Sequence, residues 1–200
     1  SGAQIIDSEP TLKSRESTME SLRKKNGATF IHPSNDMNVI LGNATAVMEL
    51  AKQAEQLDVV IAPVGGGGLL AGTALAVNHL HYSIETIGAE PFGADDAYLS
   101  LKTGKIQPSI NPKTIADGLK TQLGDQNFPI IRKLVSKIIR VEESEIVEAM
   151  KFIWERMKIV IEPSSAVAVA AMFRNSGEFK NRKVGVILSG GNVDLAKLPF

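Results

Sequence analysis

Four consecutive glycines, Gly65 to Gly68, are the residues whose type and spacing most directly suggest chemistry. They follow the apolar segment DVVIAPV and precede a segment with helical periodicity. Successive backbone N–H groups at the start of a helix attract anions, and glycine lets a ligand come close to the backbone. The run therefore predicts a phosphate-binding loop, and a simple turn is the weaker alternative.

Two classes of phosphate ligand are compatible with this loop. Gly66, Gly68 and Ala71 match the dinucleotide pattern G-x-G-x-x-G/A, and Glu90 ends the next predicted strand, where a ribose-binding acid would lie. These residues indicate a nicotinamide-binding oxidoreductase as one reading. A P-loop for nucleoside triphosphates is excluded, because no Gly-Lys-Ser/Thr follows the glycines.

A second candidate segment is SGGN, from Ser189 to Asn192, which follows the apolar run VGVIL. Ser189 is predicted to lie at the carboxyl end of a strand, where open α/β sheets bind their ligands. Taken by itself, the segment is also compatible with an ordinary Ser-Gly-Gly turn.

The elements that must position these loops alternate between short β-rich runs and helical segments. This alternation predicts an α/β fold, an open, largely parallel sheet with helices on both faces. The expected strands are Ala3–Ile6, Ala28–His32, Asp58–Ala62, Ile84–Ala89, Lys137–Val141 and Val184–Leu188. The expected helices are Lys13–Lys25, Gly42–Gln56, Leu69–Leu80, Ala97–Lys102, Phe128–Val135, Ile146–Met157 and Ser164–Phe173. The irregular segment from Glu90 to Gly124 is expected to line a site.

Composition limits the classes of partner. The 200 residues include 22 Lys and Arg against 22 Asp and Glu, so no net field favours nucleic acid or an anionic membrane. The absence of cysteine excludes disulfides, thiolate nucleophiles and sulfur-based zinc sites. We expect no nucleic-acid or membrane partner and a cytoplasmic location, since no apolar stretch is long enough to span a bilayer and no leader is evident.

Six segments in order, PVGGGGLLAG, EPFGADD, KTIADG, WERMK, IEPSSA and ILSGGNVD, resemble the serine racemase and serine/threonine dehydratase family of fold-type II pyridoxal-phosphate enzymes. The resemblance implies that residues 1–200 form the C-terminal, cofactor-binding part of the large domain. Roughly residues 1–30 would lead in from a small domain that is missing from this chain. The first strands of the large domain would be missing as well, so the large domain would be incomplete. It also implies a homodimer acting on a small amino acid.

The resemblance assigns the cofactor contacts. The phosphate would be held by the backbone N–H groups of Gly65, Gly66, Gly67 and Gly68. Ser189 would bind the pyridine nitrogen, Gly118 would bring backbone close to the ring, and Glu162 would lie near the ring's polar edge. Glu162 followed by Pro163 is equally typical of a helix start. A neutral serine makes the ring a weaker electron sink than a carboxylate would, which suits racemisation and β-elimination.

The resemblance also implies a site for a divalent cation, Mg²⁺ or Ca²⁺, formed by Glu90, Ala94 and Asp96. Two carboxylates and a backbone carbonyl are the hard oxygen ligands that these ions prefer. The alternative is a solvated acidic turn around Asp95 and Asp96. Lys158 and Asn192 resemble residues that contact a nucleotide effector in some racemases, although a lysine on the last turn of a helix also compensates the helix dipole.

Two segments depart from the family pattern near the cofactor. Ser34 stands where the family often has asparagine, and the family's Gly-Gln-Gly-Thr appears as Gly42-Asn43-Ala44-Thr45. The geometry on the substrate side is therefore not assigned from this resemblance.

The family's Schiff-base lysine lies in a Ser-Phe-Lys-x-Arg-Gly segment, which this sequence does not contain. Phe179-Lys180 imitates its centre, but Glu178 precedes it and a polar loop surrounds it. No catalytic residue is assigned in this chain, and the lysine is expected upstream. The predicted function of the parent protein is racemase or β-eliminating ammonia-lyase on serine, threonine or 3-hydroxyaspartate, with this chain inactive alone. A non-catalytic remnant of such a site is the further alternative.

Overall fold

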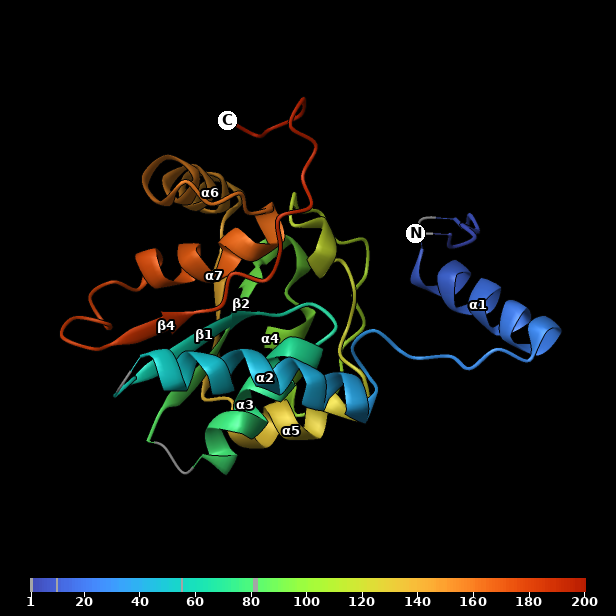
Figure 1. The fold of residues 1–200 in the computed structure, drawn as a ribbon, viewed down its shortest axis with the longest axis horizontal. Coiled ribbons are helices and arrows are strands. Elements are labelled where there is room, and N and C mark those ends of the chain that lie inside the picture. The colour runs from blue at the N-terminus through green and yellow to red at the C-terminus, as the bar shows by residue number, and fades with distance from the viewer. Residues whose placement is uncertain (1, 10, 55, 81–82) are drawn as a thin grey trace. The chain divides into compact units, whose positions relative to one another are not determined.

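The computed structural model describes residues 2–9, 11–54, 56–80 and 83–200. The chain divides into two compact units, one ending at His32 and one beginning at Pro33. In the first unit, helix α1 (Leu12–Asn26) begins after Thr11, whose hydroxyl accepts the Ser14 N–H at 3.2 Å (Figure 1). It ends at Gly27, which takes the left-handed conformation at φ 64°. The helix predicted over Lys13–Lys25 is confirmed.

The strands predicted at Ala3–Ile6 and Ala28–His32 are wrong, since both segments lack regular structure. A strand needs a neighbouring strand to pair its backbone N–H and C=O groups. The described part of the first unit contains no strand that could supply this pairing. The apolar residues of these segments suggested strands, but a local apolar pattern does not provide a second strand to pair with.

The second unit is built on a four-stranded parallel sheet in the order β3-β2-β1-β4. Its strands are β1 (Val59–Pro63), β2 (Glu85–Pro91), β3 (Lys137–Val141) and β4 (Val184–Val186). All five residues of β1 are buried, as expected for a central strand that is covered on both faces.

Helices cover both faces of this sheet, which confirms the predicted fold class (Figure 1). One face packs against α7 (Pro163–Arg174), which in turn contacts α6 (Glu143–Met157). The other face carries α3 (Gly68–His79), flanked by α2 (Met37–Gln53) and α5 (Asn127–Leu134). Beyond the end of β2 lies the short helix α4 (Asp96–Thr103). In the described part of the chain, no helix combines the length and apolarity needed to cross a membrane.

Two predicted boundaries differ from the structure for identifiable reasons. Helix α2 begins at Met37 rather than Gly42, because the Asp36 carboxylate accepts the N–H groups of Asn38 and Val39 and caps the helix there. Strand β4 is shorter than predicted, yet the Ile187 N–H still donates to the Ile61 carbonyl at 2.9 Å. The chain therefore stays extended beyond β4 as it approaches Ser189.

The strand order reverses at β1. The chain proceeds from β1 to β2 and β3 on one side and then returns to place β4 on the other side of β1. In open α/β sheets, ligands bind outside the carboxyl ends of the strands at such a reversal. The segments that follow β1 and β4 are the glycine run and Ser189, so the topology brings both predicted loops to one crevice.

Candidate functional site

The glycine run leaves the carboxyl end of β1 and becomes the start of α3. Gly67 occupies the N-cap position in the left-handed conformation, with φ 85°. Among the described residues, the N–H groups of Gly65, Gly66, Gly67 and Gly68 donate to no acceptor. Unsatisfied N–H groups at a helix start form an anion site, because the partial positive charge of the helix terminus adds to their own.

Each of these positions also leaves no room for a side chain. A β-carbon at Gly66 would lie 2.2 Å from the Ser34 hydroxyl oxygen, and one at Gly68 would lie 2.9 Å from the backbone of Ser34. At Gly67 it would meet Leu123 at 2.6 Å. Ser34, which departs from the family pattern, therefore lies directly beside the glycine run.

The turn at Gly118 belongs to a short 3₁₀ helix (Asp117–Leu119) that lies against the glycine run. A β-carbon at Gly65 would lie 3.1 Å from the Gly118 carbonyl oxygen, and one at Gly118 would lie 3.7 Å from a Glu162 carboxylate oxygen. The Gly118 N–H donates to the Ser164 hydroxyl at 3.0 Å. The structure thus brings together Gly65, Gly118 and Glu162, three of the residues that the resemblance assigned to the cofactor.

The start of α7 holds the segment that follows β4. The Ser189 N–H donates to the Ser165 hydroxyl at 2.9 Å, and the Glu162 N–H donates to the Gly190 carbonyl at 3.0 Å. Glu162 occupies the N-cap position, but its side chain does not cap α7 and instead accepts the Asn192 N–H at 2.9 Å. Glu162 therefore starts a helix, as one reading predicted, and its carboxylate binds the backbone of the segment that follows Ser189.

Ser164 and Ser165 are site residues that the sequence interpretation missed. They are 2% and 0% exposed, and their hydroxyls orient Gly118 and Ser189. Two serines at the start of an otherwise apolar helix could have indicated this role. Buried hydroxyls require hydrogen-bond partners, so the two serines could have been expected to bind nearby backbone.

Glu90 is 1% exposed, and its two carboxylate oxygens accept the Ala97 and Tyr98 N–H groups at 3.0 and 2.9 Å. Burial, reinforced by the negative charge of Asp96, raises the pKa of Glu90 well above its usual range. A carboxylate that is 1% exposed is not accessible to a ligand as large as a ribose. This geometry disfavours the dinucleotide reading.

The two neighbouring aspartates have opposite environments. Asp95 forms a 2.7 Å ion pair with Arg140, whose guanidinium stacks on Tyr98 at 3.8 Å from the ring centre. Asp96 is 4% exposed, and neither of its carboxylate oxygens has a hydrogen bond of normal geometry. Burial raises the pKa of Asp96 to about 7, an effect that the nearby Ser109 hydroxyl partly offsets.

A cavity of about 300 Å³ opens beside Asp96 and is also lined by Ala94 and Ser109. Buried carboxylate oxygens that lack hydrogen-bond partners fit a divalent cation, which would supply the missing positive charge. Glu90 does not line this cavity. No cluster of three or more His, Cys, Asp or Glu side chains suited to a metal occurs among the described residues, so such a site would rely on two carboxylates and a carbonyl.

The predicted effector residues are both exposed. Lys158 ends α6 in the left-handed conformation, at φ 59°. In the described structure, no hydrogen bond or ion pair joins Lys158 to the other predicted site residues, whereas the Asn192 N–H binds Glu162.

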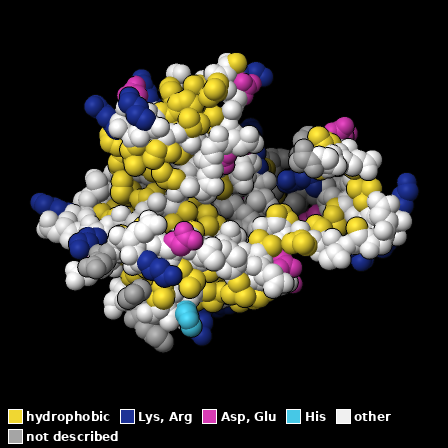
Figure 2. All heavy atoms as spheres, in the orientation of Figure 1, with side chains coloured by type: hydrophobic (Ala, Val, Ile, Leu, Met, Phe, Trp, Pro, Cys, Tyr) yellow, Lys and Arg dark blue, Asp and Glu magenta, His cyan; other side chains and the backbone are white. Residues whose placement is uncertain are grey.

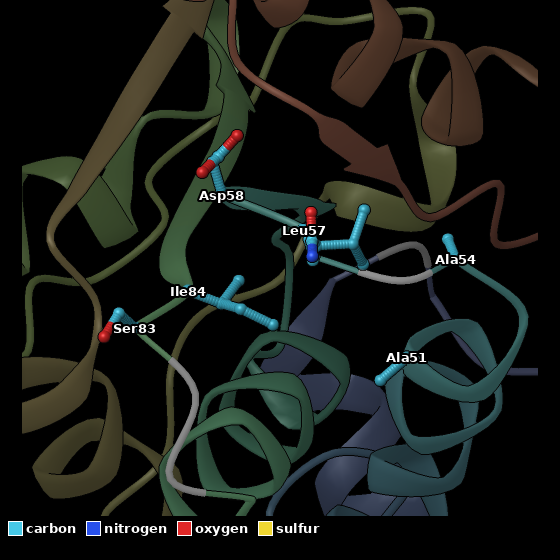
Figure 3. A pocket seen from close by; sticks show the side chains of 7 residues that line it. Ala51, Ala54, Leu57, Asp58, Ser83 and Ile84 are labelled. Carbon is cyan, nitrogen blue, oxygen red and sulfur yellow. The ribbon is translucent and has the colours of Figure 1, made fainter.

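A larger cavity of about 460 Å³ lies at the amino ends of β1 and β2, opposite the end of the sheet that carries the glycine run (Figure 3). Its lining includes Ala51, Leu57 and Ile84. The Asp58 carboxylate at its border already accepts the Lys183 N–H at 2.7 Å. Because α/β sheets bind ligands at the carboxyl ends of their strands, we place the site at the glycine loop and not here.

A sequence model of the family described as pyridoxal-phosphate dependent enzyme matches residues 1–190. The chain belongs to this family. Among curated relatives of this pyridoxal-phosphate enzyme, a β-hydroxyaspartate dehydratase from Paracoccus denitrificans is 46% identical over 100% of this chain and 63% of its own length. A serine racemase from Dictyostelium discoideum is 48% identical over 98% of this chain and 62% of its own length.

Solved structures agree with this assignment. The Dictyostelium serine racemase superposes with a TM-score of 0.88 at 47% identity, over 97% of this chain and 63% of that one. Maize serine racemase gives a TM-score of 0.91 at 41% identity, over 98% and 61%. The chain therefore spans less than two thirds of these relatives. The family resemblance and the fold predicted from the sequence are confirmed, and the family's cofactor is pyridoxal phosphate.

The residues present fit this cofactor. The N–H groups at Gly66 to Gly68 that lack acceptors match a phosphate. Ser189 is exposed near the carboxyl end of the adjacent strand β4, and its hydroxyl has no partner among the described residues, so it is free to meet a ring nitrogen. The family match also overturns the nicotinamide alternative.

Proposed function

We propose that the full-length protein is a pyridoxal-phosphate-dependent racemase, a β-eliminating ammonia-lyase, or both, acting on serine, threonine or 3-hydroxyaspartate. The observation that carries this proposal is that the glycine loop and Ser189 follow the carboxyl ends of the adjacent strands β1 and β4, where the strand order reverses. Relatives described as serine racemase and β-hydroxyaspartate dehydratase support the class of substrate.

In this proposal each segment of the crevice has a separate task. The N–H groups of Gly65, Gly66, Gly67 and Gly68 bind the cofactor phosphate and fix its position. Gly118 lets the backbone approach the ring, and Ser164 holds that turn through the Gly118 N–H. When bound, pyridoxal phosphate withdraws electrons from the α-carbon of an amino acid and so acidifies its proton.

Ser189 would set how strongly that electron withdrawal acts. Its hydroxyl can share a hydrogen bond with the pyridine nitrogen, but it cannot hold a proton there as a carboxylate does. Ser165 and Glu162 orient this segment by binding the N–H groups of Ser189 and Asn192. A moderate electron sink suits reactions in which the α-proton returns or the β-hydroxyl leaves at once.

The proposal is tested by assaying the full-length protein on L-serine, L-threonine and 3-hydroxyaspartate. We expect a D-amino acid, a keto acid with ammonia, or both, from at least one substrate, and loss of the product when the cofactor is removed. Chiral chromatography and keto-acid detection distinguish the two reactions. Absence of both products from all three substrates would contradict the proposal.

We also propose that Mg²⁺ or Ca²⁺ binds Asp96, the Ala94 carbonyl and Glu90. The support is the buried Asp96 carboxylate without hydrogen-bond partners, beside a cavity that Ala94 also lines. Each Glu90 oxygen accepts one N–H and retains a lone pair that could face a cation.

Added Mg²⁺ or Ca²⁺ is expected to raise the melting temperature of the full-length protein, and Asp96→Ala is expected to remove this response. Binding to the folded state alone contributes roughly 2.7 kcal/mol at a hundredfold excess over Kd, which is easily seen by calorimetry. The matched control is Asp95→Ala, because Asp95 is paired with Arg140 and should not be needed as a ligand. An unchanged melting temperature with metal and with chelator, or a full response in Asp96→Ala, would show that the acidic pair is only a turn.

We also propose two further features of the full-length protein, a homodimer and a site for a nucleotide effector. The first is a homodimer, which is consistent with apolar side chains exposed over α6 and α7, where Phe152 and Phe173 are 44% and 41% exposed (Figure 2). The second is a nucleotide effector near Lys158 and Asn192.

A further inference from the structure

Asn127 is a fully buried side chain that joins three backbone segments around the glycine loop. Its amide nitrogen donates to the Gly66 carbonyl at 2.7 Å and to the Ser34 carbonyl at 2.9 Å. Its amide oxygen accepts the Gly124 N–H at 3.0 Å. Asn127 is 0% exposed, and both of its donor hydrogens are used. This environment leaves it little freedom to reorient.

The bond to the Gly66 carbonyl determines where the next N–H points. In a planar trans peptide, the C=O and N–H groups point in opposite directions. Because Asn127 holds the Gly66 carbonyl, the Gly67 N–H must point away from Asn127. In the described structure, this N–H has no acceptor.

Asn127 also lies close to Gly67. Gly67 has φ 85°, and a β-carbon there would lie 2.9 Å from the Asn127 amide oxygen. Through the Ser34 carbonyl, Asn127 also fixes the segment whose backbone crowds Gly68. Asn127 thus constrains the residues on both sides of the proposed phosphate position without itself being exposed to it.

We infer that Asn127 is the positioning residue of the phosphate loop: it aims the Gly67 N–H at the cofactor phosphate, and so sets how strongly the protein prefers pyridoxal phosphate to pyridoxal. This inference rests on the proposed function, in which Gly66 to Gly68 bind that phosphate. Residue 127 lies far from the loop in sequence, and the pairing of the Asn127 amide with Gly66 is visible only in the folded chain.

The test compares dissociation constants of pyridoxal phosphate and pyridoxal, which lacks the phosphate, for the cofactor-stripped full-length protein. Two neutral variants avoid adding charge: Asn127→Leu removes all three hydrogen bonds, and Asn127→Thr retains a shorter hydroxyl. We expect Asn127→Leu to lower the preference for the phosphorylated form at least about tenfold, as for loss of a hydrogen bond to a charged group, with a smaller loss in Asn127→Thr. Pyridoxal affinity should stay nearly unchanged, and the ³¹P resonance of the bound cofactor should shift.

Phe128→Leu is the matched control for general destabilisation. Phe128 is the adjacent residue of α5 and belongs to a buried apolar cluster that includes Leu70 and Ala71 of α3. It should lower the melting temperature but leave the preference for pyridoxal phosphate intact. If Asn127→Leu does not fold, the Asn127→Thr variant decides the outcome by itself. Variants that keep the wild-type preference would overturn the role of Asn127, whereas a wild-type protein with no such preference would instead overturn the proposed phosphate site.

Discussion

Replacing Gly68 by alanine is expected to weaken binding of pyridoxal phosphate by at least about a hundredfold, as for loss of two charge-assisted hydrogen bonds. The new β-carbon would lie 2.9 Å from the Cα and carbonyl oxygen of Ser34. Both are backbone atoms and cannot rotate away, so the start of α3 must shift. The N–H groups that are proposed to bind the phosphate would move with it. Spectroscopic titration of the cofactor-stripped full-length protein measures this loss.

The control for this variant is Gly177→Ala. Gly177 lies in a turn after α7, and a β-carbon there would meet nothing within 4 Å. Its cofactor affinity should equal that of the wild type. If Gly68→Ala binds pyridoxal phosphate as tightly as Gly177→Ala does, the phosphate does not bind at this loop.

The second large effect is expected from Gly72→Ala in α3, which should destabilise the protein by about 3 kcal/mol or prevent folding. A β-carbon at Gly72 would lie 2.3 Å from the Ile40 carbonyl oxygen and 2.8 Å from the Ala44 nitrogen, both in the backbone of α2. Helices α2 and α3 would have to separate, and the glycine loop begins α3. Urea unfolding or calorimetry of the full-length protein gives the change.

Gly42→Ala provides the matched substitution on the facing helix. Gly42 lies within α2, and a β-carbon there would have open space within 4 Å. Alanine is a better helix former, so this variant should be neutral or more stable by up to about 1 kcal/mol. Equal melting temperatures for Gly42→Ala and Gly72→Ala would contradict the packing described for α2 and α3.

Sequence pattern predicted the sheet of the second unit well because its strands are local apolar runs bounded by turns. The run DVVIA and the glycines that follow it predict β1 and its loop from local sequence alone. The strand at Lys137–Val141 matched its prediction at both ends. The predicted strands at Ala3–Ile6 and Ala28–His32 failed because pairing is a property of two segments, and a pattern within one segment does not reveal its partner.

The supporting side chains could not be found in the same way, since their partners are distant in sequence. Ser164 binds Gly118 across 46 residues, and Asn127 binds Gly66 across 61 residues. A buried hydroxyl or amide signals that a partner exists, but it does not identify that partner.

The acidic turn shows the same limit. The sequence placed Asp95 and Asp96 side by side, and only the resemblance favoured Asp96 as a ligand. In the structure, Arg140 lies 45 residues away in sequence and engages Asp95. That ion pair leaves Asp96 as the carboxylate without a partner beside the cavity.

The most direct test of the account is a crystal structure of the full-length protein with pyridoxal phosphate bound. We predict that the phosphate lies within hydrogen-bonding distance of the N–H groups of Gly66, Gly67 and Gly68, and that the pyridine nitrogen lies within the same distance of the Ser189 hydroxyl. A phosphate bound elsewhere, or a pyridine nitrogen that faces a carboxylate instead of Ser189, would contradict the account.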